Sequence, residues 1–140
     1  MHKKVFLTST DTAIGFISQS QEALDKAKQR VEGKKYIIAL TSLKYIKKRV
    51  PKKYKNLVRR AKKTTFILSR NYSFRVIQDK KHKLLINRLG WIYTTSANRS
   101  GEEFNLDYAI ENSDVIVYNL RENSPSTILQ LGVKKFRKVR

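Results

Sequence analysis

Four short polar stretches hold the side chains that could bind a ligand or do chemistry. Each lies beside an apolar run that is typical of a strand or a helix. In open α/β sheets, ligand sites gather at the ends of strands, where such stretches come together. The four are residues 8–12 (TSTDT), 28–34 (KQRVEGK), 94–101 (TTSANRSG) and 124–128 (SPSTI).

The second stretch carries the cations Lys28, Arg30 and Lys34. An arginine can hold a phosphate with two parallel hydrogen bonds, and lysines add point charges, so this stretch could form a phosphate clamp. A simpler interpretation remains open, because cations at the end of a helix also suit the helix dipole.

The third stretch places Ser96 and Asn98 two residues apart among small side chains. Small side chains let the backbone approach a ligand closely, which suits a nucleotide phosphate or ribose. The hydroxyl-rich residues 8–12 could bind a small polar ligand in the same way. Alternatively, either stretch is a turn whose side chains only satisfy their own backbone.

Other chemistries find too few residues in this chain. There is no cysteine, and of the two histidines His2 is near the terminus while His82 is expected to be a solvated residue of a basic helix. Neither a metal-ligand spacing nor a phosphate-binding glycine loop is present. An enzyme of this composition would work by positioning its substrates and neutralising their charge.

Alternating strands and helices must position these stretches. We expect one α/β domain over residues 1–140, with a twisted mixed β-sheet flanked by helices. A capping box of Ser18 and Gln21 predicts the start of the first helix, and Gly90 the end of another. Residues 52–62 are either helix or loop. The expected strands are residues 5–9, 36–40, 64–68, 74–77, 91–95, 115–120, 127–131 and 136–139, and the other helices are residues 42–48, 81–89 and 106–112.

Charge is the strongest feature of the composition. The chain has 31 Lys and Arg against 11 Asp and Glu, a net charge of +20, with no acidic residue from position 33 to 78. Such a one-sided field attracts polyanions, of which RNA is the natural candidate, although a generally basic proteome or solubility would also explain it. The candidate RNA-binding residues are Lys44, Lys47, Lys48, Arg49, Lys52, Lys53, Arg59 and Arg60.

No apolar stretch is long enough for a signal peptide or a membrane span, so we expect a cytoplasmic protein.

Taken in order, the polar stretches resemble the YrdC-like family, which includes YciO and the threonylcarbamoyl-adenylate synthases. The family segment S-A-N-x-S-G is intact at residues 96–101, and P-S-T is intact at residues 125–127. The family's P-T-D-T-x-Y-G reads STDTAIG here, and K-x-R-P-x-x-K-P-L reads KQRVEGKKY. Its P-G-P-x-T turn is replaced by AKKTT at residues 61–65, and an R-x-P segment is matched weakly at residues 75–77.

This resemblance implies an L-threonylcarbamoyladenylate synthase. It would combine L-threonine, bicarbonate and ATP, bound with Mg²⁺, into threonylcarbamoyl-AMP and pyrophosphate. A separate transferase complex would use the product to modify tRNA to threonylcarbamoyladenosine. The alternative is a non-catalytic module on the same fold that binds double-stranded RNA or tRNA; an unrelated ribosome-associated protein is disfavoured by the ordered motifs.

The resemblance also implies roles for particular residues. Lys28 and Arg30 would be catalytic, and no metal would be held by the protein itself. The arginine that closes the ATP site is Arg140 or, in another register, Arg137. The implied ATP-binding residues are Lys28, Arg30, Lys34, Thr65, Ser96, Asn98 and Arg140, and the implied threonine-binding residues are Thr10, Thr12, Ser69, Thr94 and Ser126.

Overall fold

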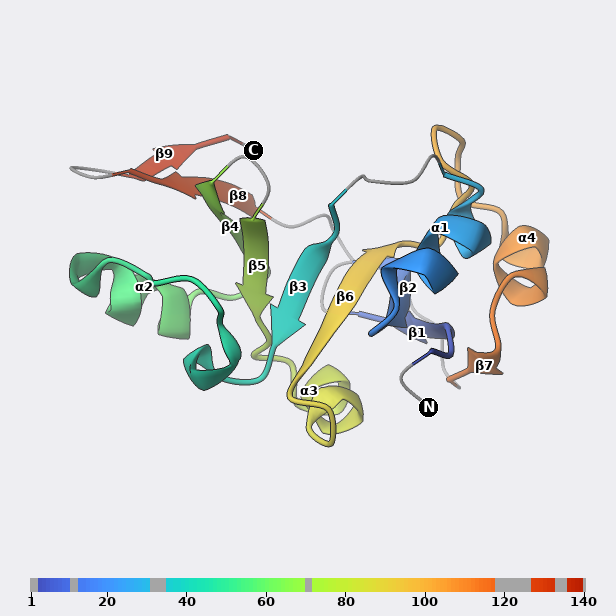
Figure 1. The fold of residues 1–140 in the computed structure, drawn as a ribbon, viewed down its shortest axis with the longest axis horizontal. Helices are drawn as coiled ribbons and strands as arrows, with labels where there is room; N and C mark the ends of the chain where they lie inside the picture. The colour runs from blue at the N-terminus through green and yellow to red at the C-terminus, as the bar shows by residue number, and fades with distance from the viewer. Residues whose placement is uncertain are drawn as a thin grey trace.

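A mixed sheet of nine strands runs through the part of the chain that the structure describes (Figure 1). The structure, a computed structural model, describes residues 3–10, 13–30, 35–69, 72–117, 127–132 and 136–139. The strand order is β7-β1-β2-β6-β3-β5-β4-β8-β9. The strands are β1 (Phe6–Ser9), β2 (Ile14–Ser18), β3 (Ile37–Leu40), β4 (Thr64–Ser69), β5 (Tyr72–Val76), β6 (Trp91–Ser96), β7 (Val115–Ile116), β8 (Thr127–Leu131) and β9 (Phe136–Lys138).

Helices cover both faces of this sheet. They are α1 (Gln21–Lys28), α2 (Lys55–Arg60), α3 (Lys80–Ile86) and α4 (Leu106–Glu111), with 3₁₀ turns η1 (Leu43–Tyr45) and η2 (Lys52–Tyr54). Phe16 packs in one cluster with Leu24 of α1, whereas its neighbour Ile17 packs in another with Ile86 of α3. Because successive strand residues point to opposite faces, α1 and α3 lie on opposite sides of the sheet. The predicted α/β fold with a mixed, helix-flanked sheet is therefore confirmed.

The start of the first helix differs from the prediction. Ser20, not Ser18, is the N-cap of α1, and its hydroxyl accepts a hydrogen bond from the backbone N–H of Ala23 at 3.2 Å. Ser18 instead ends β2, a strand that the sequence pattern did not predict, and pairs with Tyr93 of β6. Pairing with a neighbouring strand outweighed the local capping signal. Such an outcome is common, because local propensities are weak compared with tertiary contacts.

Two other expected elements are shorter than predicted. Within residues 42–48 only the turn η1 is helical, and Ile46 is already extended. The cations that follow have no acidic residue nearby with which to form helix-stabilising pairs. Residues 52–62, left open between helix and loop, contain η2 and α2. β7 spans only Val115–Ile116, and residues 118–120 of the expected strand lie outside the described residues.

The prediction for His82 was wrong, because this side chain is buried, with 3% of its surface exposed. His82 and Ile86 lie four residues apart in α3, and both face the sheet, while Leu84 points away and is 71% exposed. Gly90 follows α3 as predicted: its φ is +77° and its N–H donates to the carbonyl of Ile86 at 2.9 Å.

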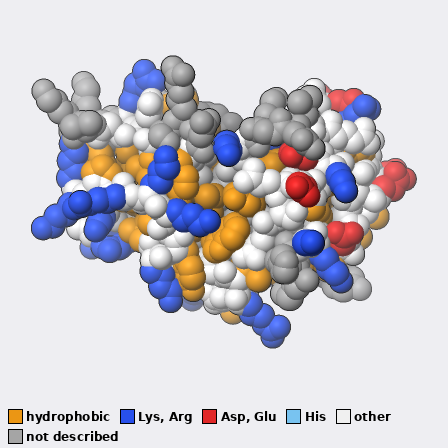
Figure 2. All heavy atoms as spheres, viewed as in Figure 1, with side chains coloured by type: hydrophobic (Ala, Val, Ile, Leu, Met, Phe, Trp, Pro, Cys, Tyr) orange, Lys and Arg blue, Asp and Glu red, His pale blue; other side chains and the backbone are white. Residues whose placement is uncertain are grey.

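The charges divide the molecule into two ends. All eight candidate RNA-binding cations are exposed, and they lie on the segment from η1 to α2. Figure 2 shows Lys and Arg gathered over that end and acidic side chains over the end that carries α1 and α4. Among the described residues, no helix has the length and apolar character needed to cross a membrane.

Candidate active site where helix α1 meets strand β6

Lys28 joins the end of α1 to the loop that follows β6. Its side chain is 2% exposed, and its Nζ donates to the carbonyl of Ser96 at 2.9 Å and to the carbonyl of Asn98 at 3.0 Å. A third contact reaches Asn98 Oδ1 at 3.2 Å. An ammonium group has three N–H donors, so these three oxygens match its whole capacity. The sequence thus brings together three of the residues assigned to ATP.

Burial, followed by the nearby positive charge of Arg30, lowers the pKa of Lys28 to about 8. Removing an ammonium from water disfavours its charged form, and a like charge adds to this effect. The cation at the centre of this junction therefore loses its proton in a pH range where ordinary lysines keep theirs.

The loop beyond Ser96 is fixed by its own hydrogen bonds. Asn98 Oδ1 also accepts from the Ser96 hydroxyl, and Asn98 Nδ2 donates to the carbonyls of Arg99 at 2.9 Å and Glu102 at 2.7 Å. The N–H of Ser100 donates to the carbonyl of Lys28 at 2.9 Å. Asn98 is thus an organiser of the loop, while Ser96 is the exposed member that a ligand can reach.

Gly15 allows β2 to lie close enough to β6 to hold Ser96 in place. The two residues are partners in the sheet, and a Cβ on Gly15 would be 2.6 Å from the backbone oxygen of Thr95. That distance is far shorter than a van der Waals contact, so only glycine fits here.

Arg30 lies beside this junction with one donor unused. Its guanidinium carbon is 4.9 Å from the centre of the Tyr36 ring, and its buried Nε has no hydrogen-bond partner among the described residues. The Tyr36 hydroxyl donates to Asp25 Oδ1 at 2.5 Å. Burial, followed by this hydrogen bond, raises the pKa of Tyr36 to about 12. Stacking on a neutral phenol fixes the arginine, whose guanidinium adds a positive charge beside the junction.

The two described threonines assigned to substrate threonine differ in their surroundings. The Thr10 hydroxyl donates to the carbonyl of Ala13 at 2.6 Å and accepts from its N–H at 3.1 Å, so it closes the turn between β1 and β2. This is the simpler role considered for residues 8–12. Thr94 lies within β6, buried, opposite Ile17 and Ile37. It points to the sheet face that α3 covers.

Thr65 lies three strands away from Thr94, on β4. Its hydroxyl accepts from Arg75 Nε at 3.2 Å, and both side chains are buried. Arg75 pairs with Ala39, and Thr94 pairs with Ile37. Ala39 and Ile37 are two residues apart in β3, so Arg75 and Thr94 lie on the same face of the sheet. Arg75 was assigned no role from the sequence. The weak match to the R-x-P segment at residues 75–77, together with a cation inside a predicted strand, was the signal that could have identified it.

The remaining predicted site residues lie on β9 or outside the described residues. Arg137 is exposed on β9, where its Nη2 donates to Gln130 Oε1 at 3.0 Å. Within the described ranges, no group of three His, Cys, Asp or Glu side chains is arranged to hold a metal ion. Outside the described residues lie Thr12, Lys34, Ser126, Arg140 and the side chain of Ser69.

Comparison of the sequence with known proteins gives one curated relative and no matching family model. The relative is the uncharacterised protein MG259 of Mycoplasma genitalium, 30% identical over 142 aligned positions. The alignment covers 92% of this chain but 31% of MG259, so the chain spans about a third of that relative's length.

Solved structures share the whole fold at low sequence identity. Sua5 of P. abyssi, solved with L-threonine, matches with a TM-score of 0.79 and 19% identity over 99% of this chain and 50% of Sua5. YciO of E. coli matches with 0.77 and 18%, over 98% and 82%. Full-length HypF, solved in a phosphate- and nucleotide-bound form, matches with 0.76 and 17%, over 99% and 22%. This chain therefore has the YrdC-like fold of Sua5 and YciO, as its ordered motifs predicted.

Proposed function

We propose that this chain is the catalytic domain of an L-threonylcarbamoyladenylate synthase. The observation that carries the proposal is the junction of Lys28, Ser96 and Asn98, with Arg30 beside it, whose buried Nε has no partner within the described part of the chain. Proteins with the same fold have been solved with L-threonine and with phosphate and nucleotide. The chain spans about half the length of Sua5, so the full activity is inferred here from the site.

The reaction needs positioning and charge neutralisation but no covalent nucleophile. The amine of threonine adds to bicarbonate to give a carbamate and water. A carbamate oxygen then attacks the α-phosphorus of ATP, and pyrophosphate leaves. Negative charge accumulates on the phosphates in this step, and cations fixed beforehand stabilise it.

The residues divide these tasks. Arg30 contacts a phosphate through its guanidinium, and Ser96 offers its exposed hydroxyl to the nucleotide. Lys28 is a positioning residue in this proposal, because its three donors already hold the Ser96–Asn98 backbone. Thr94 and the buried cation Arg75 lie on one face of the sheet, and this face would bind the substrate threonine. Mg²⁺ would enter with ATP as part of the substrate.

Pyrophosphate release tests this proposal. Purified protein supplied with L-threonine, bicarbonate and MgATP should release pyrophosphate only when threonine is present. Arg30→Ala should lower this rate by at least tenfold, because it removes a charged donor from the transferred phosphate. Arg88→Ala, at an exposed arginine after α3, is the matched control and should keep the rate. Threonine-independent release, or equal losses in the two variants, would contradict the proposal.

A second candidate function is RNA binding without catalysis. It is favoured by the eight exposed cations between η1 and α2, which the synthase reaction does not use. Protein that binds tRNA or duplex RNA but releases no threonine-dependent pyrophosphate would support this candidate over the synthase.

A further inference from the structure

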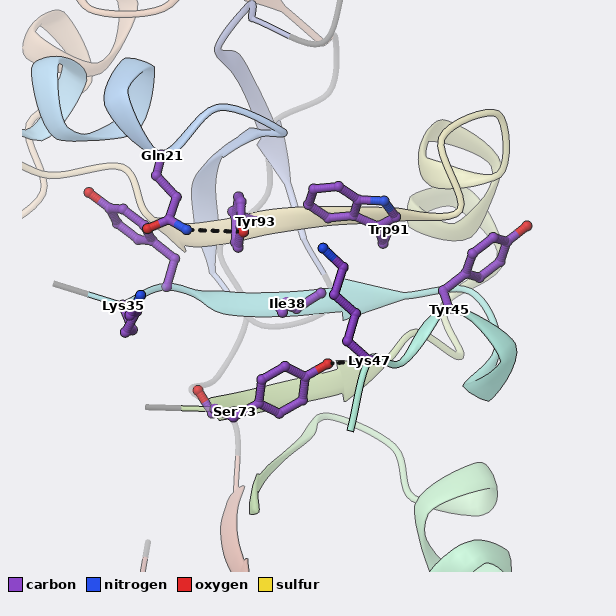
Figure 3. Close-up of a pocket in the computed structure, with 10 residues that line it drawn as sticks. Gln21, Lys35, Ile38, Tyr45, Lys47, Ser73, Trp91 and Tyr93 are labelled. Atoms are coloured by element: carbon purple, nitrogen blue, oxygen red, sulfur yellow. Dashed lines mark hydrogen bonds between the residues drawn. The ribbon is translucent and has the colours of Figure 1, made fainter. Parts of the chain in front are cut away.

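An aromatic pocket lies on the sheet face opposite α3, between α1 and η1. Its volume is about 130 Å³. Figure 3 shows its floor on β3 and β6, with Ile38, Trp91 and Tyr93, and Tyr45 closing one end. Tyr72 of β5 also lines it. Ligand sites for drug-sized molecules usually measure 300 Å³ or more, so this pocket suits one small planar group.

Four of the aromatic rings that line this pocket are held in place but are only half-buried, whereas Tyr36 is buried. Trp91 and Tyr93 meet edge to face, with ring centres 5.2 Å apart at 80°. Gln21 Nε2 donates to the Tyr93 hydroxyl at 3.0 Å. Tyr45 lies against Gly90, where an added Cβ would be 2.4 Å from its ring. Trp91, Tyr93, Tyr45 and Tyr72 are all half-buried, so a planar ligand can reach ring surface that is already fixed.

Two exposed lysines, Lys35 and Lys47, line the pocket, and two more, Lys44 and Lys48, lie over rings that line it. The Nζ atoms of Lys44, Lys47 and Lys48 lie 5.0, 5.6 and 5.6 Å from the ring centres of Tyr45, Trp91 and Tyr72. All three distances are within the ~6 Å over which a cation is attracted to the face of an aromatic ring. Figure 3 shows the Lys47 side chain reaching across the pocket toward Trp91. A lysine stem is flexible, so this ammonium can move to a nearby phosphate when a ring takes its place.

Rings for stacking beside cations for phosphate form the combination that binds unpaired nucleotides. A base in a duplex hides both faces, so only an unpaired base can stack on Trp91. The exposed cations continue along the chain from η1 through η2 and α2 to Arg60. Figure 2 shows hydrophobic surface across the middle of this face with Lys and Arg beside it.

We propose that this pocket binds one unpaired base of a single-stranded RNA segment, with Lys44, Lys47 and Lys48 on the flanking phosphates. The proposal goes beyond the synthase, since the pocket includes neither Lys28 nor Ser96 and shares with that site only Tyr36, the ring beside Arg30. It also specifies which form of RNA the basic end of the molecule recognises.

The position of the single tryptophan provides a direct test. Trp91 is the only tryptophan in the chain, so its fluorescence reports on this pocket alone. A short single-stranded RNA should quench it in a saturable way, with an apparent affinity that falls steeply as salt increases. The same RNA annealed into a duplex, and an abasic strand of the same length, should leave the fluorescence unchanged. The titration contains neither threonine nor ATP, so its result is separate from the synthase test.

Quenching by the duplex or the abasic strand as strong as by the single strand would overturn the proposal, as would no quenching at low salt. Adenosine monophosphate is the comparison for a free nucleotide. The two ligands are compared by the concentration of nucleotide units that saturates the quenching. If adenosine monophosphate saturates it at the same concentration as the RNA, free nucleotides are the ligand, and the proposal of an RNA site fails.

Two variants separate stacking from charge. Tyr45→Ala should weaken binding of the single strand by about 5- to 150-fold, the loss expected for one stacking partner. Lys47→Glu is an exposed substitution that should not disturb folding, and it should lower both the affinity and the salt dependence. Lys81→Glu, at an exposed position on α3 across the sheet, is its matched control. Equal weakening by the two charge reversals would reject a site at this pocket.

Discussion

Lys28 and Lys47 show how the same side chain serves two different regions of this protein. Lys28 is buried at the end of α1, surrounded by three oxygen acceptors, with its pKa lowered to about 8. Lys47 is exposed, with its ammonium over the ring of Trp91. The first holds a loop in one conformation, and the second is free to exchange a ring for a phosphate. The Lys28 ammonium has lost its water and must keep its three protein acceptors, so it holds one conformation. The Lys47 ammonium remains hydrated, so it can move between partners.

Substituting one glycine beside each lysine tests how rigid the two regions are, and these substitutions should give the largest changes in the free energy of unfolding. Gly15→Ala places a methyl group against backbone at the Lys28 junction, which cannot move aside, so we expect a loss of about 3 kcal/mol in the free energy of unfolding. Gly90→Ala meets only the movable Tyr45 ring but keeps a left-handed φ, which should cost about 1.5 kcal/mol. Urea denaturation measures both. A larger loss for Gly90→Ala would reverse our view of which region is rigid.

Replacing each lysine by methionine compares the two directly. Lys28→Met leaves the partly buried carbonyls of Ser96 and Asn98 without their donor, so we expect a loss of about 2 kcal/mol in the free energy of unfolding. Lys47→Met is an exposed change and should stay within about 0.5 kcal/mol. The measurement is chemical denaturation at neutral pH. Equal stability of the two variants would show that Lys28 does not anchor its loop.

The pH dependence of stability isolates the titration of Lys28. Its folded pKa of about 8 is below the ordinary value of 10.5, so the unfolded chain binds more protons between these values. Its contribution to stability therefore rises with pH above about 8, by at most about 1.4 kcal/mol per pH unit. The difference in unfolding free energy between wild type and Lys28→Met should grow as pH is raised through this range. A constant difference would contradict the lowered pKa.

The smallest expected effect compares a serine cap from each region. Ser20 caps α1 with a hydrogen bond of 3.2 Å, and Ser42 caps η1 with one of 3.5 Å. Ser20→Ala should lower the free energy of unfolding by about 1 kcal/mol, because α1 loses a partner for one of its first N–H groups. Ser42→Ala should cost a few tenths of that amount. Thermal unfolding followed by circular dichroism can rank the two, and the opposite order would be a contradiction.

Apolar runs predicted most strands because strand residues must cover a core. The runs at residues 36–40, 64–68 and 91–95 each correspond to a strand within one or two residues. The errors occurred where tertiary contacts outweighed local signals. β2 was missed, and its last residue, Ser18, was taken for a helix cap. His82 was expected in solvent because its neighbours are basic, although its spacing from Ile86 placed it against the sheet.

The candidate site was predictable in composition but not in how its parts connect. Motif order selected Lys28, Arg30, Ser96 and Asn98, and the structure places all four around the end of α1. The sequence did not reveal that the donors of Lys28 are already used, since hydrogen bonds across 68 to 70 residues have no local pattern. Arg75 was overlooked for the same reason, because its place beside Thr65 depends on strand register.

The sequence by itself determined the net charge, the polar motifs and, through their order, the fold. These are properties of residue type and spacing along the chain. Only the tertiary structure decided which lysine is fixed and which is exposed, and that Trp91, Tyr45 and Tyr72 line one pocket. These rings come from segments up to 46 positions apart in the chain, counted from Tyr45 to Trp91. Strand pairing brings them together, and burial, which depends on every neighbour in space, sets the chemistry of each side chain.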